Sequence, residues 1–206
     1  MNTPDYWQQA CRELAKRDAV LKRLIKLQRG LTLRSRGDAF TTLARAIVGQ
    51  QISVKAAQTV WEKLAAAVPV VSPKQIATTE TTTLRTCGLS GKKIEYIQNL
   101  TNHFLEGSLN EARWPQLDDE ELIAQLMQVK GIGRWTAEMF LIFYMMRPDV
   151  LPLDDIGLQR AMSLHYNKNR PVSKLKMRAI AKEWMPWRSV ATWYLWRSLD
   201  PLPVEY

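Results

Sequence analysis

A chain of 206 residues is long enough to bury a hydrophobic core, either in one large domain or in two small lobes that share a cleft. Its 46% hydrophobic and 24% charged residues exclude a disordered chain, and no apolar run approaches the ~18 residues that a membrane-spanning helix needs. The net charge of +9 indicates a polyanionic partner, and the dispersed basic residues favour nucleic acid over an anionic membrane.

Helix signals follow one another along the chain, and strand alternation is nearly absent. In the first half we expect helices over 5–27 with a break near Asp18, over 39–51, after Ser53 to 67, after Ser72, over 81–86 and after Ser90 to 106. In the second half we expect helices over 119–129 with a capping box of Asp118 and Glu121, over 134–146, over 156–166 capped by Asp154, over 174–184 capped by Ser173, and over 189–198. The prediction is therefore an all-α fold of about ten helices.

Cysteine and histidine are too scarce for the common metal sites. Cys11 and Cys87 lie far apart in a chain whose N-terminus shows no secretion signal, so we expect two reduced thiols and a cytoplasmic protein. Two cysteines cannot supply the four ligands of an iron–sulfur cluster. His103 and His165 are isolated, so we expect no zinc site and interpret both as surface or packing residues.

A glycine-rich turn lies between two of the expected helices, within Val129-Lys130-Gly131-Ile132-Gly133-Arg134-Trp135-Thr136-Ala137. Gly131 and Gly133 permit a tight turn and leave N–H groups uncovered at the start of the following helix, where the dipole favours an anion. The turn, anchored by Ile132, would hold a phosphate without reading base sequence. A glycine turn by itself also suits a plain αα-hairpin, but the longer string from Leu126 to Ala137 resembles the DNA-binding helix–hairpin–helix motif.

Two aspartates follow Leu151-Pro152-Leu153 and open the next helix. Asp154 is interpreted as the N-cap, and an interaction with the helix dipole would account for Asp155. The spacing favours a further interpretation. An acidic residue about 20 positions after Trp135, behind a proline-containing loop, resembles the helix–hairpin–helix/Gly-Pro-Asp superfamily of DNA glycosylases.

Four motifs extend this resemblance to the bacterial DNA-3-methyladenine glycosylase II family: residues 45–53, 131–137, 151–155, and 186–191 with Trp196. The resemblance implies a single glycosylase unit over 1–206, with two helical lobes flanking a DNA-binding cleft. Lobe one is expected at about 35–146, with the helix–hairpin–helix at 119–146, and lobe two at about 1–34 plus 147–206. We expect no extra β-rich N-terminal domain of the kind that longer members carry.

The same resemblance implies roles in catalysis and base recognition. Asp155 is expected to stabilise the positive charge that builds on the deoxyribose and to orient water. Trp135 and Trp196 are expected to form an aromatic pocket that attracts a cationic base. Met139 stands where the best-known family pocket has a Tyr. Among the other tryptophans, we interpret Trp61, Trp184 and Trp187 as core residues.

Further residues are expected to contact DNA. Gln51, with Ile52 as second choice, would fill the gap left by a flipped base; the alternative is that Ile52 is core and Gln51 a loop residue. Phosphate contacts are expected at Gly131, Gly133, Arg134 and Thr136. The family's hairpin often holds a monovalent cation, Na⁺ or K⁺, through main-chain carbonyls, here those of Met127, Val129 and Ile132; no other cofactor is expected to be required.

The resemblance predicts a monofunctional enzyme, because Trp135 occupies the position of the lysine nucleophile of bifunctional relatives and cannot form a Schiff base. We expect it to act as a monomer on double-stranded DNA, in the cytoplasm at the nucleoid or in a eukaryotic nucleus. It would flip out alkylated purines of the 3-methyladenine and 7-methylguanine type and leave an abasic site. The alternatives are a non-catalytic helix–hairpin–helix module, a mismatch or oxidised-base glycosylase and, more distantly, a membrane-surface protein.

Overall fold

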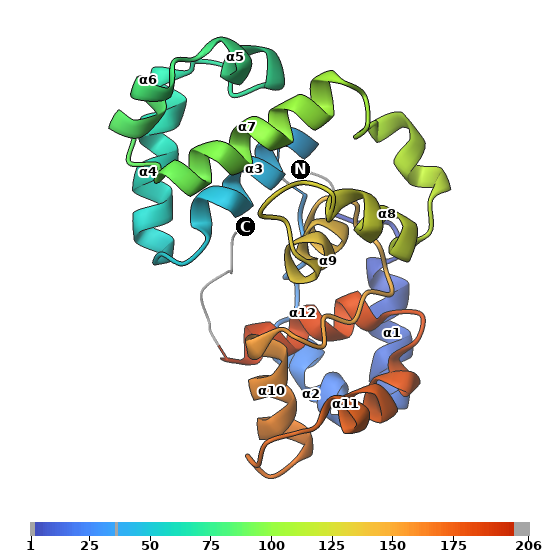
Figure 1. The fold of residues 1–206 in the computed structure, drawn as a ribbon. Coiled ribbons are helices and arrows are strands. Elements are labelled where there is room, and N and C mark those ends of the chain that lie inside the picture. Colours follow the sequence, from blue (N-terminus) through green and yellow to red (C-terminus); the bar gives the residue numbers. More distant parts are fainter. Residues whose placement is uncertain (1–2, 36, 200–206) are drawn as a thin grey trace. The chain divides into compact units, whose positions relative to one another are not determined.

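The computed structural model describes residues 3–35 and 37–199, which form helices joined by short loops, with no strand among them (Figure 1). The α-helices of the described chain are α1 (Trp7–Arg17), α2 (Ala19–Leu27), α3 (Ala39–Gly49), α4 (Val54–Ala67), α5 (Pro73–Thr78), α6 (Thr81–Thr86), α7 (Gly91–Leu105), α8 (Asp119–Leu126), α9 (Arg134–Phe143), α10 (Ile156–Tyr166), α11 (Lys174–Ala181) and α12 (Arg188–Leu199). Two 3₁₀ helices, η1 (Glu111–Gln116) and η2 (Lys182–Trp184), accompany them. The predicted all-α fold is confirmed.

Most predicted helix starts are confirmed, because the capping side chains are in place. The side chains of Asp18, Ser53, Ser72, Ser90 and Ser173 each accept a hydrogen bond from a main-chain N–H in the first turn of the following helix. The predicted capping box is also present, with reciprocal bonds between residues 118 and 121 at the start of α8.

Several predicted helix ends were wrong by a few residues. Helix α8 ends at Leu126 rather than residue 129, and α9 ends at Phe143 rather than 146. Met146 adopts a left-handed backbone with φ 53°, and the N–H of Arg147 turns back to the carbonyl of Leu141. Such a residue terminates a helix, and side-chain periodicity does not reveal it. Helix η1, which contains a proline, was not predicted.

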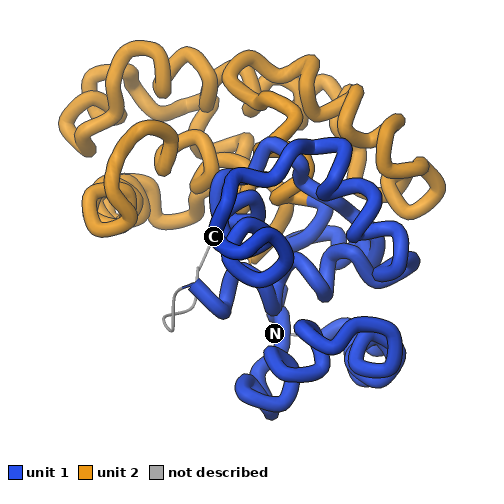
Figure 2. The backbone as a smooth tube through the Cα atoms, turned by 90° about the horizontal axis from the view of Figure 1, so that it is seen from below, with its two compact units in different colours: residues 1–36, 141–205 blue, residues 37–140, 206 orange. Residues whose placement is uncertain are grey.

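The described chain divides into two compact units, coloured separately in Figure 2. Unit 1 comprises residues 3–35 and 141–199, and unit 2 comprises residues 37–140. The chain passes from unit 2 to unit 1 within α9, a few residues before the expected lobe boundary at 146.

Unit 2 is built around α7, which packs against α3, α5 and α6. The helix contributes Ile97 and Leu100 to the core, and both are fully buried. An aromatic cluster joins α3, α7, η1 and α9, since Phe104 packs edge-on against both Phe40 and Trp114. Trp114 also packs edge-on against Phe140. Helix α9, which follows the glycine turn, is therefore packed into the core of unit 2 through Phe140.

Unit 1 is built around α12, which packs against α1, α2 and α10. Trp7 on α1 is 1% exposed and lies edge-on to Trp193 of α12. Trp184 is fully buried, and its indole N–H donates to Asp18 at 2.9 Å. Helix α12 is thus the helix around which the other helices of unit 1 pack.

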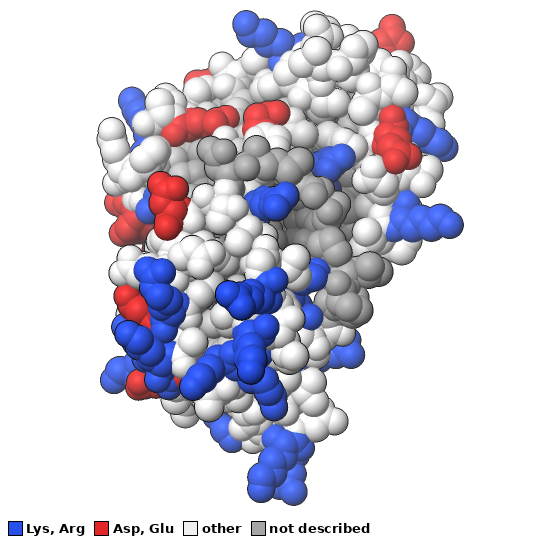
Figure 3. Space-filling view, turned by 180° about the vertical axis from the view of Figure 1, so that it is seen from behind, with Lys and Arg blue, Asp and Glu red and all other residues white. Residues whose placement is uncertain are grey.

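The positive charge is divided unevenly between the units. Residues 1–36 and 141–205 contain 19 Lys and Arg against 9 Asp and Glu, whereas residues 37–140 contain 10 against 11. Unit 1 therefore carries the whole net positive charge, and blue side chains gather over its part of the face drawn in Figure 3. No helix among residues 3–35 and 37–199 is long and apolar enough to cross a membrane.

Candidate active site

The turn between α8 and α9 is formed around Gly131. This residue has φ +86°, a left-handed conformation that L side chains rarely adopt. A Cβ atom at this position would also lie 2.2 Å from Cδ2 of Tyr96. Ile132 is 4% exposed and anchors the turn, as predicted. Gly131 is therefore fixed both by its backbone conformation and by the packing of α7.

Gly133 differs from Gly131, because neither reason applies to it. Its φ lies outside the left-handed region, and a Cβ there would meet no atom of the described chain within 4 Å. It immediately precedes α9, whose first-turn N–H groups have no partners within the helix. A residue without a side chain at this point leaves room for a ligand to approach those groups.

Helix α7 also ties the turn to the loop after α3. Asn99 accepts a hydrogen bond from the N–H of Lys130 at 2.7 Å, and the Gln50 side chain donates to the carbonyl of Gly131 at 2.7 Å. The Lys93 ammonium donates to the carbonyl of Val48 at 2.6 Å, and burial lowers the pKa of Lys93. The sequence did not reveal these contacts, because long-range pairs between polar side chains and backbone leave no periodic signal.

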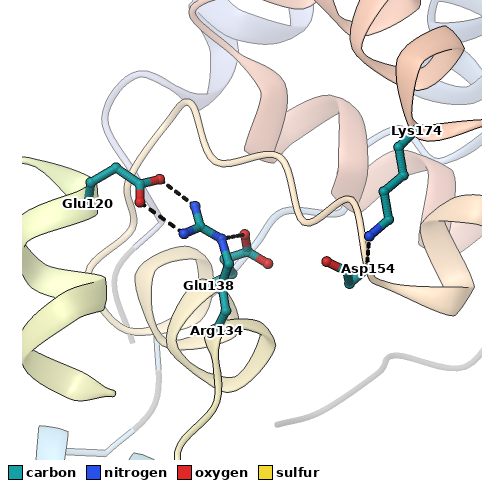
Figure 4. Close-up of polar contacts among 5 residues, drawn as sticks. All are labelled: Glu120, Arg134, Glu138, Asp154 and Lys174. Carbon is teal, nitrogen blue, oxygen red and sulfur yellow. Dashed lines mark hydrogen bonds and ion pairs between the residues drawn. The ribbon is translucent and has the colours of Figure 1, made fainter. Parts of the chain in front are cut away.

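Arg134 is engaged in ion pairs within unit 2. Figure 4 shows its guanidinium between two carboxylates, with bonds to both oxygens of Glu120 and a 3.1 Å bond from Nε to Glu138. The hydrogen bond that Arg134 donates to Glu120 is the main reason that the pKa of Arg134 is raised. Because the side chain is occupied, the main-chain N–H is the better candidate for the expected phosphate contact. Thr136, in the same turn, is 7% exposed.

The loop after α3, here called the wedge loop, carries the two wedge candidates, Gln51 and Ile52. Gln51 is exposed and has φ 59°, which is uncommon for a residue with a side chain. Ile52 is 40% exposed, so it is not the core residue of the alternative interpretation. Both side chains are accessible on a loop whose preceding residue, Gln50, is bonded to the glycine turn.

The candidate cation ligands lie in the same turn. Met127 follows the last residue of α8, and the Val129 carbonyl accepts a 3.1 Å bond from the N–H of Ile132. Main-chain carbonyls in a short turn are oxygen donors of the type that monovalent cations take, so this set fits such an ion. Among the described residues, no group of three or more His, Cys, Asp and Glu side chains could hold a metal.

Asp155 lies in unit 1, at the start of α10. It is 7% exposed, and its Oδ1 accepts two 2.6 Å hydrogen bonds, from the N–H of Leu158 and from the indole N–H of Trp196. Asp155 is therefore the N-cap of α10, and the prediction that Asp154 is the cap was wrong. Asp154 instead forms an exposed ion pair with Lys174 (Figure 4).

Trp196 is 8% exposed and is held on two sides. One side of its ring stacks on Phe143, with centroids 5.7 Å apart and planes at 11°, and its N–H holds Asp155. The ring also presses against Gly157, where a Cβ would lie 3.0 Å from Trp196 Cδ1 and 3.1 Å from Asp155 Oδ1. Gly157 was not singled out in the sequence, since only the fold reveals that two site residues approach its backbone.

The two remaining pocket candidates lie one helical turn apart on α9. Trp135 is 36% exposed, whereas Met139 is 4% exposed. Trp61, Trp184 and Trp187 are at most 9% exposed, which confirms that they are core residues. Trp135 therefore stands apart from these tryptophans in exposing a large part of its ring.

The expected site residues thus lie in two groups, one in each unit. In unit 1, Asp155 and Trp196 are in direct contact. In unit 2, the wedge loop is bonded to the glycine turn through Gln50, and Trp135 follows that turn directly. Each group is held by hydrogen bonds and packing inside its own unit.

The chain is similar to several known DNA glycosylases. Over 188 residues the chain is 30% identical to DNA-3-methyladenine glycosylase 1 of Schizosaccharomyces pombe, covering 88% of this chain and 82% of that protein. It is 30% identical over 199 residues to a DNA-3-methyladenine glycosylase of Bacillus subtilis, covering 91% of this chain and 66% of that protein. The chain spans 59% of a second B. subtilis relative, so some of these relatives are considerably longer.

A solved structure of a DNA-3-methyladenine glycosidase from Bacillus halodurans has the same fold, with a TM-score of 0.87 and 31% identity over 97% of this chain and 93% of that one. Residues 44–186 match the HhH-GPD superfamily of base excision DNA repair proteins. This segment contains the wedge loop, the glycine turn and Asp155. The chain therefore belongs to the HhH-GPD superfamily.

Proposed function

We propose that the protein is a monofunctional DNA-3-methyladenine glycosylase of base excision repair. It flips alkylated purines out of double-stranded DNA and hydrolyses the N-glycosidic bond, leaving an abasic site. The observation that carries the proposal is the buried Asp155 carboxylate, held at the start of α10 by Trp196 and Leu158. The relatives' names supply the substrate class, alkylated adenine.

The chemistry assigned to Asp155 is electrostatic. Cleavage of the glycosidic bond builds positive charge on the deoxyribose, and a fixed carboxylate stabilises that charge most strongly where water is excluded. Two donors fix Oδ1, so the carboxylate does not need to reorient during the reaction. An alkylated purine cation is already a good leaving group, which reduces the need for a general acid.

The candidates to contact the damaged base are Trp135, Trp196 and Met139. An indole ring attracts a cationic base through its π face, with an energy of roughly 0.5–2 kcal/mol per contact. The exposed ring of Trp135 suits this role, whereas Trp196, stacked on Phe143, serves mainly to bound the site and hold Asp155. Met139 adds an adaptable apolar surface.

DNA is held by main-chain groups of the turn. We assign phosphate contacts to the N–H groups at Gly133, Arg134 and Thr136, with Gly131 shaping the turn. Gln51 is the first candidate to fill the gap in the duplex, and the exposed side chain of Ile52 is the second. The carbonyls of Met127, Val129 and Ile132 would hold a Na⁺ or K⁺ ion, and no other cofactor is assigned.

The alternatives account for fewer of these features. A non-catalytic DNA-binding module requires the turn but gives no reason for a carboxylate held by an indole N–H. A lyase would need an amine nucleophile in place of Trp135. Solved structures of an 8-oxoguanine glycosylase/lyase from Clostridium acetobutylicum share the fold at 18–19% identity, and a likeness at this level carries no information on substrate. We infer a monomer that acts on nucleoid DNA in the cytoplasm, or in the nucleus of a eukaryote.

The test is Asp155→Asn, with Asp154→Asn as its matched control. Asn is as good an N-cap as Asp and can still accept from the Trp196 indole, so the variant removes the charge without removing the cap. We expect Asp155→Asn to lose at least about 100-fold in single-turnover base release while binding DNA as the wild type does.

Asp154→Asn should release base at the wild-type rate, because Asp154 is exposed and forms an ion pair with Lys174 on the surface of the structure. Equal rates for wild type and Asp155→Asn would remove Asp155 from the mechanism. Equal losses in the two variants would show that the effect is general to this loop rather than specific to the buried carboxylate.

A further inference from the structure

The loop that leads from α9 to Asp155 is held in place by residues that have no role in the proposed function described above. Residues 147–155 form no helix or strand and contain Pro148 and Pro152. The main-chain polar groups of such a partly buried segment must find partners elsewhere, or the segment will not hold one conformation. In the structure, the start of the loop finds these partners at the beginning of α12.

Ser189 binds three successive parts of the loop. Its main-chain N–H donates to the carbonyl of Pro148 at 3.0 Å, and its Oγ donates to the carbonyl of Arg147 at 2.6 Å. The same Oγ accepts from the N–H of Val150 at 2.9 Å. Ser189 is fully buried, so water cannot replace these bonds.

Arg188 binds the side chain of Asp149 in the same loop. Its Nε and Nη2 donate to the two carboxylate oxygens of Asp149, at 2.7 and 2.9 Å, and its main-chain N–H donates to Oδ1 at 3.2 Å. The side chains of Arg188 and Asp149 are 27% and 22% exposed, so the pair is partly shielded from solvent. A bidentate pair of this kind fixes orientation as well as distance.

The far end of the loop is fixed by α10 and by α12. The N–H of Asp155 donates to the carbonyl of Pro152, and Gln159 donates to the carbonyl of Leu153. Trp196, seven residues along α12 from Ser189, then donates to Asp155 itself. Helix α12 therefore holds both ends of the segment, and Figure 1 shows the loop running beside it.

We propose that Arg188 and Ser189 are positioning residues for Asp155. We call these two residues and their partners the clamp; the partners are Arg147, Pro148, Asp149 and Val150. The clamp determines the position of the Asp155 carboxylate at the end of the loop. This gives a physical role to residues 186–191, which the sequence distinguished without assigning a task. The proposal rests on the proposed function only in that Asp155 is the catalytic carboxylate.

The clamp is tested through two measurements on Ser189→Ala, with Ser198→Ala as control. Ser198 lies on the same helix and also makes two hydroxyl bonds, to His165 and to the Leu195 carbonyl, and neither of these bonds is to the loop. The first measurement is single-turnover release of an alkylated base, together with affinity for an abasic-site duplex. The second is solvent exchange of the Trp196 indole N–H by NMR, measured without DNA.

We expect Ser189→Ala to slow base release by about 10- to 100-fold with nearly unchanged affinity for the abasic duplex, since a small displacement of a catalytic group has effects of this size. We also expect indole exchange to rise at least about tenfold. Ser198→Ala should change neither quantity. Wild-type indole exchange in Ser189→Ala would overturn the proposal.

A second pair of variants covers the case in which Ser189→Ala does not fold, and separates the clamp from a direct phosphate contact. If Arg188 acts through Asp149, then Arg188→Gln, Asp149→Asn and the double variant should show similar losses in rate and similar gains in indole exchange. If Arg188 binds a DNA phosphate instead, its variant alone will lose DNA affinity, which contradicts the clamp. A wild type that releases no alkylated base would refute the proposed function, while the exchange measurement would still decide the clamp.

Discussion

Two glycines of one turn illustrate how residues that look alike in sequence have different reasons to be glycine. Gly131 has a left-handed backbone, and a Cβ there would overlap the ring of Tyr96. Gly133 has neither constraint and precedes the first turn of α9, where anions bind well. Gly131 is therefore required by the fold, whereas the space beside Gly133 is open to a DNA phosphate. Substitution of the two glycines by alanine should therefore have different effects on stability and on DNA affinity.

Gly133→Ala should fold with a loss of at most about 1 kcal/mol in free energy of unfolding, because the new methyl group meets open space in the described chain. Its affinity for duplex DNA should fall at least about tenfold, since the methyl group stands where a phosphate approaches. Gly131→Ala should unfold several kcal/mol more easily, because both its φ and the Tyr96 ring oppose a Cβ. Denaturant unfolding and DNA titration of the two variants check this; wild-type DNA affinity for Gly133→Ala would contradict it.

At the scale of helices, the sequence predicted beginnings better than ends. Beginnings depend on one side chain and a local hydrogen bond, as at Ser53 and Asp118, whereas the end of α9 depends on the left-handed backbone of Met146. The wrong cap at α10 has a similar cause. Asp154 and Asp155 are equally good caps, and only the contact with Trp196 in the fold selects Asp155.

The pairing of α8 with α9 predicts a specific dependence on pH. The hydrogen bond from Arg134 is the largest cause that lowers the pKa of Glu120 below its ordinary value of 4.5. A carboxylate with a lowered pKa in the folded state contributes stability above pH 4.5, and this contribution is lost as pH falls through the folded pKa. Glu120 is 70% exposed, so we expect no more than about 1 kcal/mol from the pair.

Glu120→Gln should therefore be slightly less stable than the wild type at neutral pH, and this difference should shrink at an acidic pH below 4.5. Thermal unfolding of both proteins at the two pH values provides the measurement. An equal difference at both values would show that Glu120 contributes through packing rather than through its charge. The DNA affinity of the variant also reports whether Arg134, once released from Glu120, turns toward phosphate.

At the scale of the whole molecule, the carboxylate that we propose as catalytic lies in the unit that carries the net positive charge, whereas the turn proposed to bind phosphate lies in a unit with nearly balanced charge. We therefore expect unit 1 to provide most of the attraction to DNA and unit 2 to provide the main-chain contacts to phosphate. The sequence predicted the total charge and the turn. It did not predict this division or the clamp, because both depend on which distant segments pack together.

The most direct measurement of the central claim is identification of the bases that the wild type releases from duplex DNA treated with a methylating agent, with strand integrity followed before and after alkali. We expect 3-methyladenine or 7-methylguanine in solution, and strand breaks only after alkali has cleaved the abasic sites. Release of neutral oxidised bases alone, or strand breaks without alkali, would contradict a monofunctional enzyme for alkylated purines.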